Sequence, residues 1–198
     1  MPLLSLNEYI SLAEKAHGHL CAGQILGVRM ALHGLELLGL DDPLGAHRKR
    51  LISCVEIDRC ATDAIGVVTG CRLGKRALKF FDFGKMAATF CDLEAVRSVR
   101  VVALETSKQK ALDMFPEIEN RNRREMEAYR TMPSGDLFSH QWVSVPVEPE
   151  DLPGFKGPHV VCATCGERIN FKKQMSERGL TLCRACAGQR YYEVLPNS

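Results

Sequence analysis

The 198-residue sequence lacks any hydrophobic run that approaches the roughly 18–20 residues of a membrane-spanning helix. Its first residues carry no basic segment, and Glu8 appears early, so we expect no secretory signal peptide. Internal repeats and low-complexity tracts are also missing, and the net charge is only +2. These absences argue against membrane, secreted and repeat proteins, and they favour a globular protein.

Cysteine is the residue type that the chain has in excess, with nine in all. A protein held together by disulfides is usually exported and usually has an even number of cysteines. This sequence shows no export signal, and its number of cysteines is odd. We therefore expect reduced thiols and a cytoplasmic location.

Four cysteines near the C-terminus follow the spacing C-x2-C-x17-C-x2-C, and they are Cys162, Cys165, Cys183 and Cys186. Two CxxC pairs at this separation are typical of one tetrahedral Zn²⁺ held by four thiolates. A site with four sulfur ligands has no open position, so it stabilises structure and does no chemistry. The tail is therefore predicted to be a small zinc finger.

A segment rich in proline and glycine, residues 148–158, precedes these cysteines and is typical of a linker. We accordingly predict a core domain over residues 1–155 and a zinc finger over residues 156–198. The latter holds seven Lys/Arg and three Glu, hence a net charge of +4. Such a tail can contact an acidic partner, or it can simply be a solvated surface.

The core pattern predicts helices and strands that do not alternate regularly, and this indicates an α+β fold with a mainly antiparallel sheet. The predicted helices cover residues 7–16 (starting at Ser5 or Asn7), 22–38, 62–69 and, broken at Pro116, 107–130. The predicted strands cover residues 51–57, 77–83, 86–93, 98–105 and 137–147. Gly84-Lys85 separates the second strand from the third, which favours a β-hairpin.

The second predicted helix contains three glycines, Gly23, Gly27 and Gly34. Each lowers helix propensity by about 1 kcal/mol relative to alanine. We interpret them as sites where another element packs closely against the helix.

A short segment, His17–Gly23, places two histidines and one cysteine at the junction of the first two helices. Cys21 is at the start of the second helix, where free N–H groups and the helix dipole favour a thiolate. Imidazole and thiolate together suit Zn²⁺, Fe²⁺, Ni²⁺ or Cu, and they equally suit a Cys/His nucleophile pair. The candidates for metal or ligand binding are therefore His17, His19 and Cys21, and the candidates for catalysis are Cys21 and His19.

Cys60 begins another predicted helix and is the next candidate for the same pocket. Asp63 can serve there as a first-turn acid or as the partner of a histidine ligand. Lys75 can place a positive charge beside an anionic ligand. Cys54 and Cys91 lie in predicted strands and are interpreted as core residues.

Several segments of the core resemble the FmdE family, and they are His17–Gly23, Cys60–Ile65, Val68–Lys75 and Phe83–Ala87. The family takes its name from one of the subunits of formylmethanofuran dehydrogenase, a molybdenum or tungsten enzyme of methanogenesis. The resemblance implies an α+β core, a C-terminal finger of the treble-clef type and homodimers. It also implies a cavity lined by the His17/His19/Cys21 segment and Cys60. The sequence itself shows no pterin-binding or iron–sulfur motif.

The tail resembles the zinc finger of the DksA/TraR group, through Cys162–Glu167 and Leu182–Cys186 with the same gap between the cysteine pairs. That group acts on RNA polymerase through a long coiled coil, which this sequence lacks, so the resemblance implies the fold of the finger only.

Taken together, the residues and the resemblance favour a metal-binding accessory protein of one-carbon or molybdenum/tungsten metabolism. Its core would bind a metal or a small anionic ligand, and its tail would hold a structural zinc. The alternative is an adaptor that binds nucleic acid or RNA polymerase through the basic finger. The sequence does not decide whether the core is catalytic.

Overall fold

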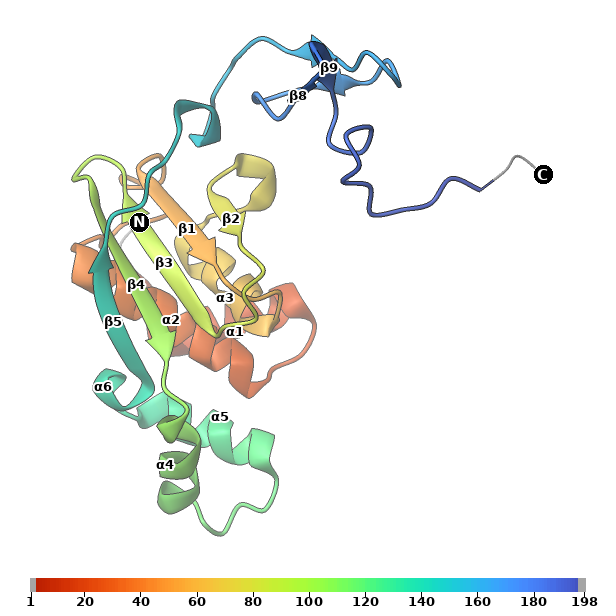
Figure 1. Cartoon of the computed structure of the whole chain (residues 1–198). Helices are drawn as coiled ribbons and strands as arrows, with labels where there is room; N and C mark the ends of the chain where they lie inside the picture. Colours follow the sequence, from red (N-terminus) through yellow and green to blue (C-terminus); the bar gives the residue numbers. More distant parts are fainter. Residues whose placement is uncertain (1–2, 196–198) are drawn as a thin grey trace. The chain divides into compact units, whose positions relative to one another are not determined.

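The computed structural model describes residues 3–195, so Met1, Pro2 and the last three residues of the predicted tail lie outside the described residues. The chain divides into two compact units, one up to Pro146 and one from Val147 on (Figure 1). Within the described residues, no helix is both long enough and apolar enough to span a membrane. The two units are described separately below.

The first unit is built on a five-stranded sheet with the strand order β2-β1-β3-β4-β5. β1 and β2 pair in parallel, and all other neighbours are antiparallel. The strands are β1 Leu51–Val55, β2 Leu78–Phe80, β3 Ala87–Asp92, β4 Arg97–Ala103 and β5 Phe138–Val143. This mixed, mainly antiparallel sheet confirms the predicted α+β class.

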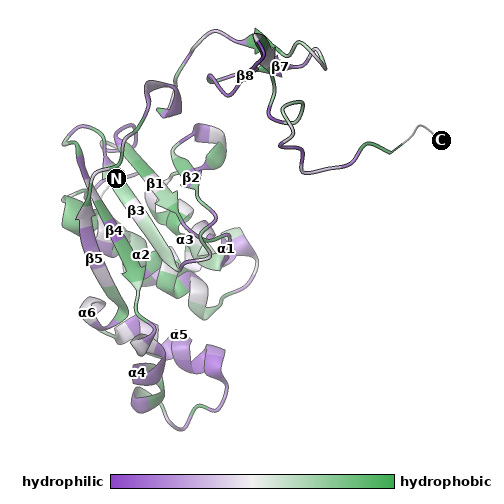
Figure 2. Cartoon of the chain, viewed as in Figure 1, coloured by the Kyte–Doolittle hydropathy of each residue, from purple (hydrophilic) through white to green (hydrophobic). Residues whose placement is uncertain are grey.

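The helices α1, α2 and α3 lie together on one side of this sheet (Figure 1). The unit contains α1 Leu6–His17, α2 Ala22–Leu38, α3 Cys60–Thr69, η1 Leu73–Lys75, α4 Thr106–Met114, α5 Arg121–Thr131 and α6 Ser134–Leu137. Figure 2 shows α2 as mostly hydrophobic and α5 as mostly hydrophilic. This agrees with α2 as the central helix, which buries eleven of its residues, and with α5 as a charged helix that buries only Ala128 and Tyr129.

The predicted hairpin between residues 77–83 and 86–93 is wrong. β2 pairs in parallel with β1, and β3 pairs with the opposite edge of β1. The chain between β2 and β3 crosses the end of β1, where the backbone N–H groups of Phe83 and Lys85 both donate to the carbonyl of Glu56. A glycine between two apolar runs allows a crossing as readily as a tight turn, and only long-range pairing decides between them. The hairpin of this region joins β3 to β4.

Two of the three glycines of α2, Gly27 and Gly34, meet their neighbours closely, as predicted, whereas Gly23 makes only ordinary contacts. A Cβ atom added at Gly27 would lie 2.4 Å from the carbonyl oxygen of Ala61 in α3. One added at Gly34 would lie 2.2 Å from the ring of Phe90 in β3. These two glycines therefore let α2 approach both α3 and the sheet.

Two side-chain contacts tie α2 to α5. The backbone N–H of Ala22 donates to Asn122 Oδ1 (3.0 Å) and so caps the start of α2. The half-buried guanidinium of Arg29 donates to the carbonyls of Tyr129 (2.7 Å) and Met132 (2.7 Å) at the end of α5. These carbonyls point outward from a helix C-terminus, where a cation is favoured. Both contacts bridge about a hundred residues of sequence.

The second unit contains a 3₁₀ turn, η2 Pro149–Asp151, and two short antiparallel hairpins. The hairpin strands are β6 Val160–Val161, β7 Arg168–Ile169, β8 Met175–Glu177 and β9 Leu180–Leu182. Among the described residues of this unit, the buried ones form a cluster of Cys162, Ile169 and Leu182. So small an apolar cluster cannot support a fold alone, so the cysteines must supply most of the stability.

Candidate functional site

The candidate site of the core begins where α1 ends. His17 is the last residue of α1, and Gly18 follows with a φ of 95°, a left-handed conformation that glycine adopts without strain. His17 Nδ1 lies 2.8 Å from Asp63 Oδ2 in the first turn of α3. The structure thus places Asp63 as the partner of a histidine, one of the two roles that the sequence allows.

Cys21 and Cys60 occupy the starts of two helices that pack against each other. Cys21 is the N-cap of α2, and Cys60 is the first residue of α3. Gly23 lies between them, because a Cβ added there would be 3.5 Å from Cys60 Cβ and 3.7 Å from Cys21 Sγ. The two cysteines are distant in the sequence, and the close approach of α2 and α3 brings them together.

The protonation of Cys60 depends on this neighbourhood. Burial raises the pKa of the Cys60 thiol, and a hydrogen bond with the Cys21 side chain raises it further. The start of α3 favours the thiolate of Cys60, whereas burial and the neighbouring Cys21 thiol favour the protonated form. A neutral Cys60 thiol follows, unless a bound cation removes its proton.

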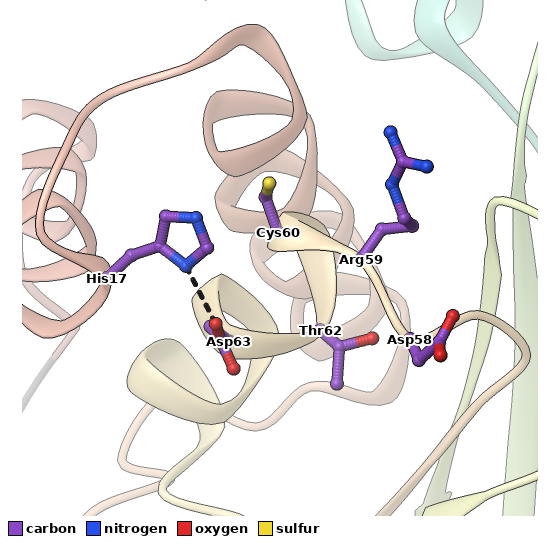
Figure 3. A pocket seen from close by; sticks show the side chains of 6 residues that line it. All are labelled: His17, Asp58, Arg59, Cys60, Thr62 and Asp63. Carbon is purple, nitrogen blue, oxygen red and sulfur yellow. Dashed lines mark hydrogen bonds and ion pairs between the residues drawn. The ribbon is translucent and has the colours of Figure 1, made fainter.

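A pocket of about 410 Å³ opens at this junction (Figure 3). Figure 3 shows the imidazole of His17 next to the side chain of Cys60 in this view, with the dashed line from His17 running down to Asp63. The lining residues are His17, Asp58, Arg59, Cys60, Thr62 and Asp63. The volume falls within the range of roughly 300–1,000 Å³ that small-molecule sites occupy.

The other predicted residues are placed less centrally. The ring of His19 lies beside that of His17, with 4.7 Å between centroids. Of the expected lining residues, His17 and Cys60 line the pocket, and His19 and Cys21 do not. Lys75 lies in η1 and is also outside the lining, whereas Arg59 belongs to it.

The sequence did not single out Asp58, Arg59 and Thr62 as lining residues. Asp58 and Arg59 lie just before Cys60, and Thr62 lies in the first turn of the same helix. Their closeness to a candidate cysteine could have identified them.

The tail holds the clearest metal geometry. Its four cysteine sulfur atoms all lie within 4.8 Å of one another, and in the described part of the chain no other set of three or more histidine, cysteine or acidic ligand atoms is grouped in this way. Backbone hydrogen bonds from Cys165 and Cys183 lower the pKa of Cys162 to about 6. Four converging sulfurs fit Zn²⁺, which thiolates bind tetrahedrally. The core histidines and cysteines are neighbours but do not form such a closed set.

Comparisons with known proteins agree with this architecture. Residues 16–139 match the family model described as FmdE, Molybdenum formylmethanofuran dehydrogenase operon. A protein of Archaeoglobus fulgidus named "Probable S-adenosyl-L-methionine-binding protein" is 30% identical over 98% of this chain, which spans 56% of that relative's length.

The crystal structure of a protein from Syntrophus aciditrophicus, described as similar to the FmdE component of a tungsten formylmethanofuran dehydrogenase, is also similar to this chain. It is 22% identical, with a TM-score of 0.62, and the match covers 98% of this chain and all of that one. This structural likeness shows a shared fold. The family match covers well over half of the chain, and the chain therefore belongs to the FmdE family.

Proposed function

We propose that this member of the FmdE family is a metal-binding accessory protein whose core pocket binds a metal ion or a small anionic ligand. The residues that would bind it are His17, Cys21 and Cys60, with His19 beside them. The observation that carries the proposal is the hydrogen bond from His17 to Asp63, next to two adjacent thiols.

The bond between His17 and Asp63 has a specific chemical consequence. With Nδ1 bonded to a carboxylate, the ring is oriented and its other nitrogen, Nε2, is available to a ligand. Metal-binding histidines commonly use this carboxylate–histidine arrangement. Two thiols and one or two imidazoles form a donor set that suits Zn²⁺, Fe²⁺, Ni²⁺ or Cu. A bound cation would also lower the pKa of Cys60 and reverse the effect of burial.

Arg59 supports the second part of the proposal, a small anionic ligand. Its guanidinium is exposed at the pocket, and within the described residues no acidic side chain pairs with it. In this proposal Arg59, and not the predicted Lys75, supplies the positive charge beside the anionic ligand. The name of the Archaeoglobus fulgidus relative makes S-adenosyl-L-methionine one candidate, because its carboxylate is a group that arginine binds well.

We further propose that the tail holds a structural zinc and that the protein acts as a homodimer. A molybdenum or tungsten enzyme complex would be its partner. The support for these partners is the family's description and the resemblance of the core segments.

Metal content per chain tests the core site. The full-length protein, purified anaerobically without an affinity tag, is analysed by mass spectrometry as wild type, Cys21→Ser and His17→Ala. We expect zinc from the tail in every protein, and a second metal in the wild type that both variants lose.

His47→Ala is the matched histidine control, because His47 lies in the loop before β1 and does not line the pocket. It should keep the second metal. Zinc alone in the wild type and in all variants would rule out the metal-binding form of the proposal. A titration with S-adenosyl-L-methionine, comparing the wild type with Arg59→Ala, would then decide the anionic form.

A further inference from the structure

We propose that the core carries a second ligand site, which binds a small carboxylic acid with an apolar chain. The site is a hollow of about 410 Å³ between α3 and the segment that leads from α3 to β2. Thr62 and Asp63 line both this hollow and the His17 pocket, so the two cavities are adjacent. Binding in the hollow does not depend on a ligand or a metal in the His17 pocket.

The backbone that follows α3 forms one wall of the hollow. Gly70 ends α3 with a φ of 68°, and the chain turns back past the helix. A Cβ added at Gly66 would lie 3.1 Å from the carbonyl oxygen of Cys71, so helix and returning chain are in close contact. The backbone N–H of Leu78 donates to the carbonyl of Arg72 (3.3 Å) and closes the loop that contains η1. These contacts hold the wall in place, as is usual for small-molecule sites.

The lining of the hollow is more apolar than polar. Val67 of α3, Leu73 of η1 and Leu78 of β2 all contribute to it, and Leu73 is 65% exposed. A single exposed leucine is ordinary at a protein surface, but this one shares a cavity with two half-buried aliphatic side chains. An apolar chain bound in the hollow would cover all three.

Cys71 gives the hollow a thiol that does not react. Its side chain is buried, and its Sγ donates to the carbonyl oxygen of Leu51 at 3.6 Å. Burial raises the pKa of the Cys71 thiol, so the thiol stays protonated. Buried, protonated thiols of this kind are inert. The hollow therefore offers Cys71 to a ligand as binding surface and not as a nucleophile.

Arg72 supplies the charge that favours an acid. It lines the hollow and is exposed, and in the described part of the chain no acidic side chain pairs with it. The acidic residue of the lining, Asp63, is bonded to His17 instead. A guanidinium binds a carboxylate through two parallel hydrogen bonds. One arginine beside an aliphatic wall fits a carboxylate on an apolar chain, whereas an inorganic anion would leave that wall uncovered.

Amide NMR spectra of the full-length protein, with zinc bound in the tail, test the site through a titration with hexanoate. We expect saturable shifts of the amide signals of residues 66–73. Butanoate should bind roughly fifteenfold more weakly, because each of two buried CH₂ groups contributes about 0.8 kcal/mol, a factor of about four. The uncharged 1-hexanol should bind about tenfold more weakly than hexanoate, because it lacks the charged partner for Arg72.

Arg72→Gln should weaken hexanoate binding to the level of 1-hexanol. Arg48→Gln is the matched control, because Arg48 is exposed in the loop before β1 and does not line the hollow. It should bind hexanoate as the wild type does. Both substitutions replace exposed side chains, and the amide spectra themselves show whether each variant is folded.

Equal hexanoate affinity in the wild type and in Arg72→Gln would overturn the proposal. So would unchanged amide signals for residues 66–73, or equal affinities for butanoate and hexanoate. The metal content of the His17 pocket is measured independently, so each of these results leaves the proposed function as it stands.

Discussion

Two buried carboxylates, Asp92 at the end of β3 and Glu56 just after β1, pair with arginines that are distant in the sequence. Asp92 is 2% exposed and accepts from Arg50 Nε at 2.8 Å. Glu56, 6% exposed, forms a two-bond pair with Arg100 at 2.6 and 2.7 Å. Paired hydrogen bonds of this kind suit the planar guanidinium. Removing one partner of a buried ion pair costs more free energy of folding than the intact pair contributes, because the other charge is left buried and unpaired.

At this scale we predict that Asp92→Asn lowers the free energy of unfolding at pH 7 by about 3 kcal/mol. Glu94→Gln is the matched control, because Glu94 also contacts Arg50 (3.1 Å) but its side chain is 73% exposed. The control should change stability by less than about 1 kcal/mol. Urea unfolding followed by circular dichroism measures both variants.

The pair of Asp92 and Arg50 also predicts that the stability of the fold depends on pH. The Arg50 guanidinium holds the pKa of Asp92 below its usual value, and backbone hydrogen bonds from Ala95 and Glu94 act in the same direction. A lowered pKa stabilises the fold at pH values above the unfolded pKa, about 3.9, and this contribution is lost as the pH falls through the folded pKa. The stability difference between the wild type and Asp92→Asn should therefore shrink below about pH 4. A constant difference from pH 7 to pH 3 would contradict the prediction.

At the scale of elements, the position of α2 decides most of the core. It packs on α3 through Gly27 and on β3 through Gly34, and α5 caps its first turn through Asn122. Since Cys21 and Cys60 begin α2 and α3, the packing of these two helices also sets the distance between the thiols. The geometry of the candidate site therefore depends more on how α2 packs against α3 than on the loop between α1 and α2.

We predict opposite effects for the same substitution at two points of α2. Gly27→Ala would drive a methyl group into the backbone of Ala61, which cannot move without shifting α3, so we expect a loss of about 1–3 kcal/mol. Gly23→Ala makes contacts no closer than 3.5 Å and should be neutral or stabilise by up to about 1 kcal/mol. Thermal unfolding of the two variants measures the difference, and equal effects would show that helix packing is not the reason for Gly27.

At the scale of the whole molecule, the two units draw their stability from different sources. The first has an extended apolar core that includes Ile25, Leu35 and Phe90, all fully buried. The second has a cluster of three buried side chains and a four-cysteine group. We therefore expect metal to matter for the fold of the tail alone.

Chelation tests this division. Removing zinc with a strong chelator, or replacing Cys165 with Ser, should abolish amide protection over residues 160–182, because the binding energy of a structural zinc is folding energy. Protection of β3 and β4 should be unchanged. Hydrogen exchange with mass spectrometry reads both regions in one sample, and a tail that keeps its protection without metal would contradict the prediction.

The sequence by itself determined the local features. The limits of α2 follow from its apolar pattern and from Gly39. For α1 the sequence allowed a start at Ser5 or Asn7, and the structure shows Ser5 as the N-cap, in a capping box with Glu8. The grouping of the four tail cysteines follows from their spacing. The helix signals act within a few residues, and the spacing of the four cysteines is typical of one tetrahedral site.

The tertiary structure alone decided what depends on distant partners. β2 and β3 lie on opposite sides of β1, which the glycine between them did not reveal. The thiols of Cys21 and Cys60 became neighbours only through the packing of α2 on α3. The rings of His33 and His140 became neighbours only because β5 pairs with β4. The physical reason is common to all three cases. Strand order and helix packing are set by the burial of whole surfaces, and no short stretch of sequence contains that information.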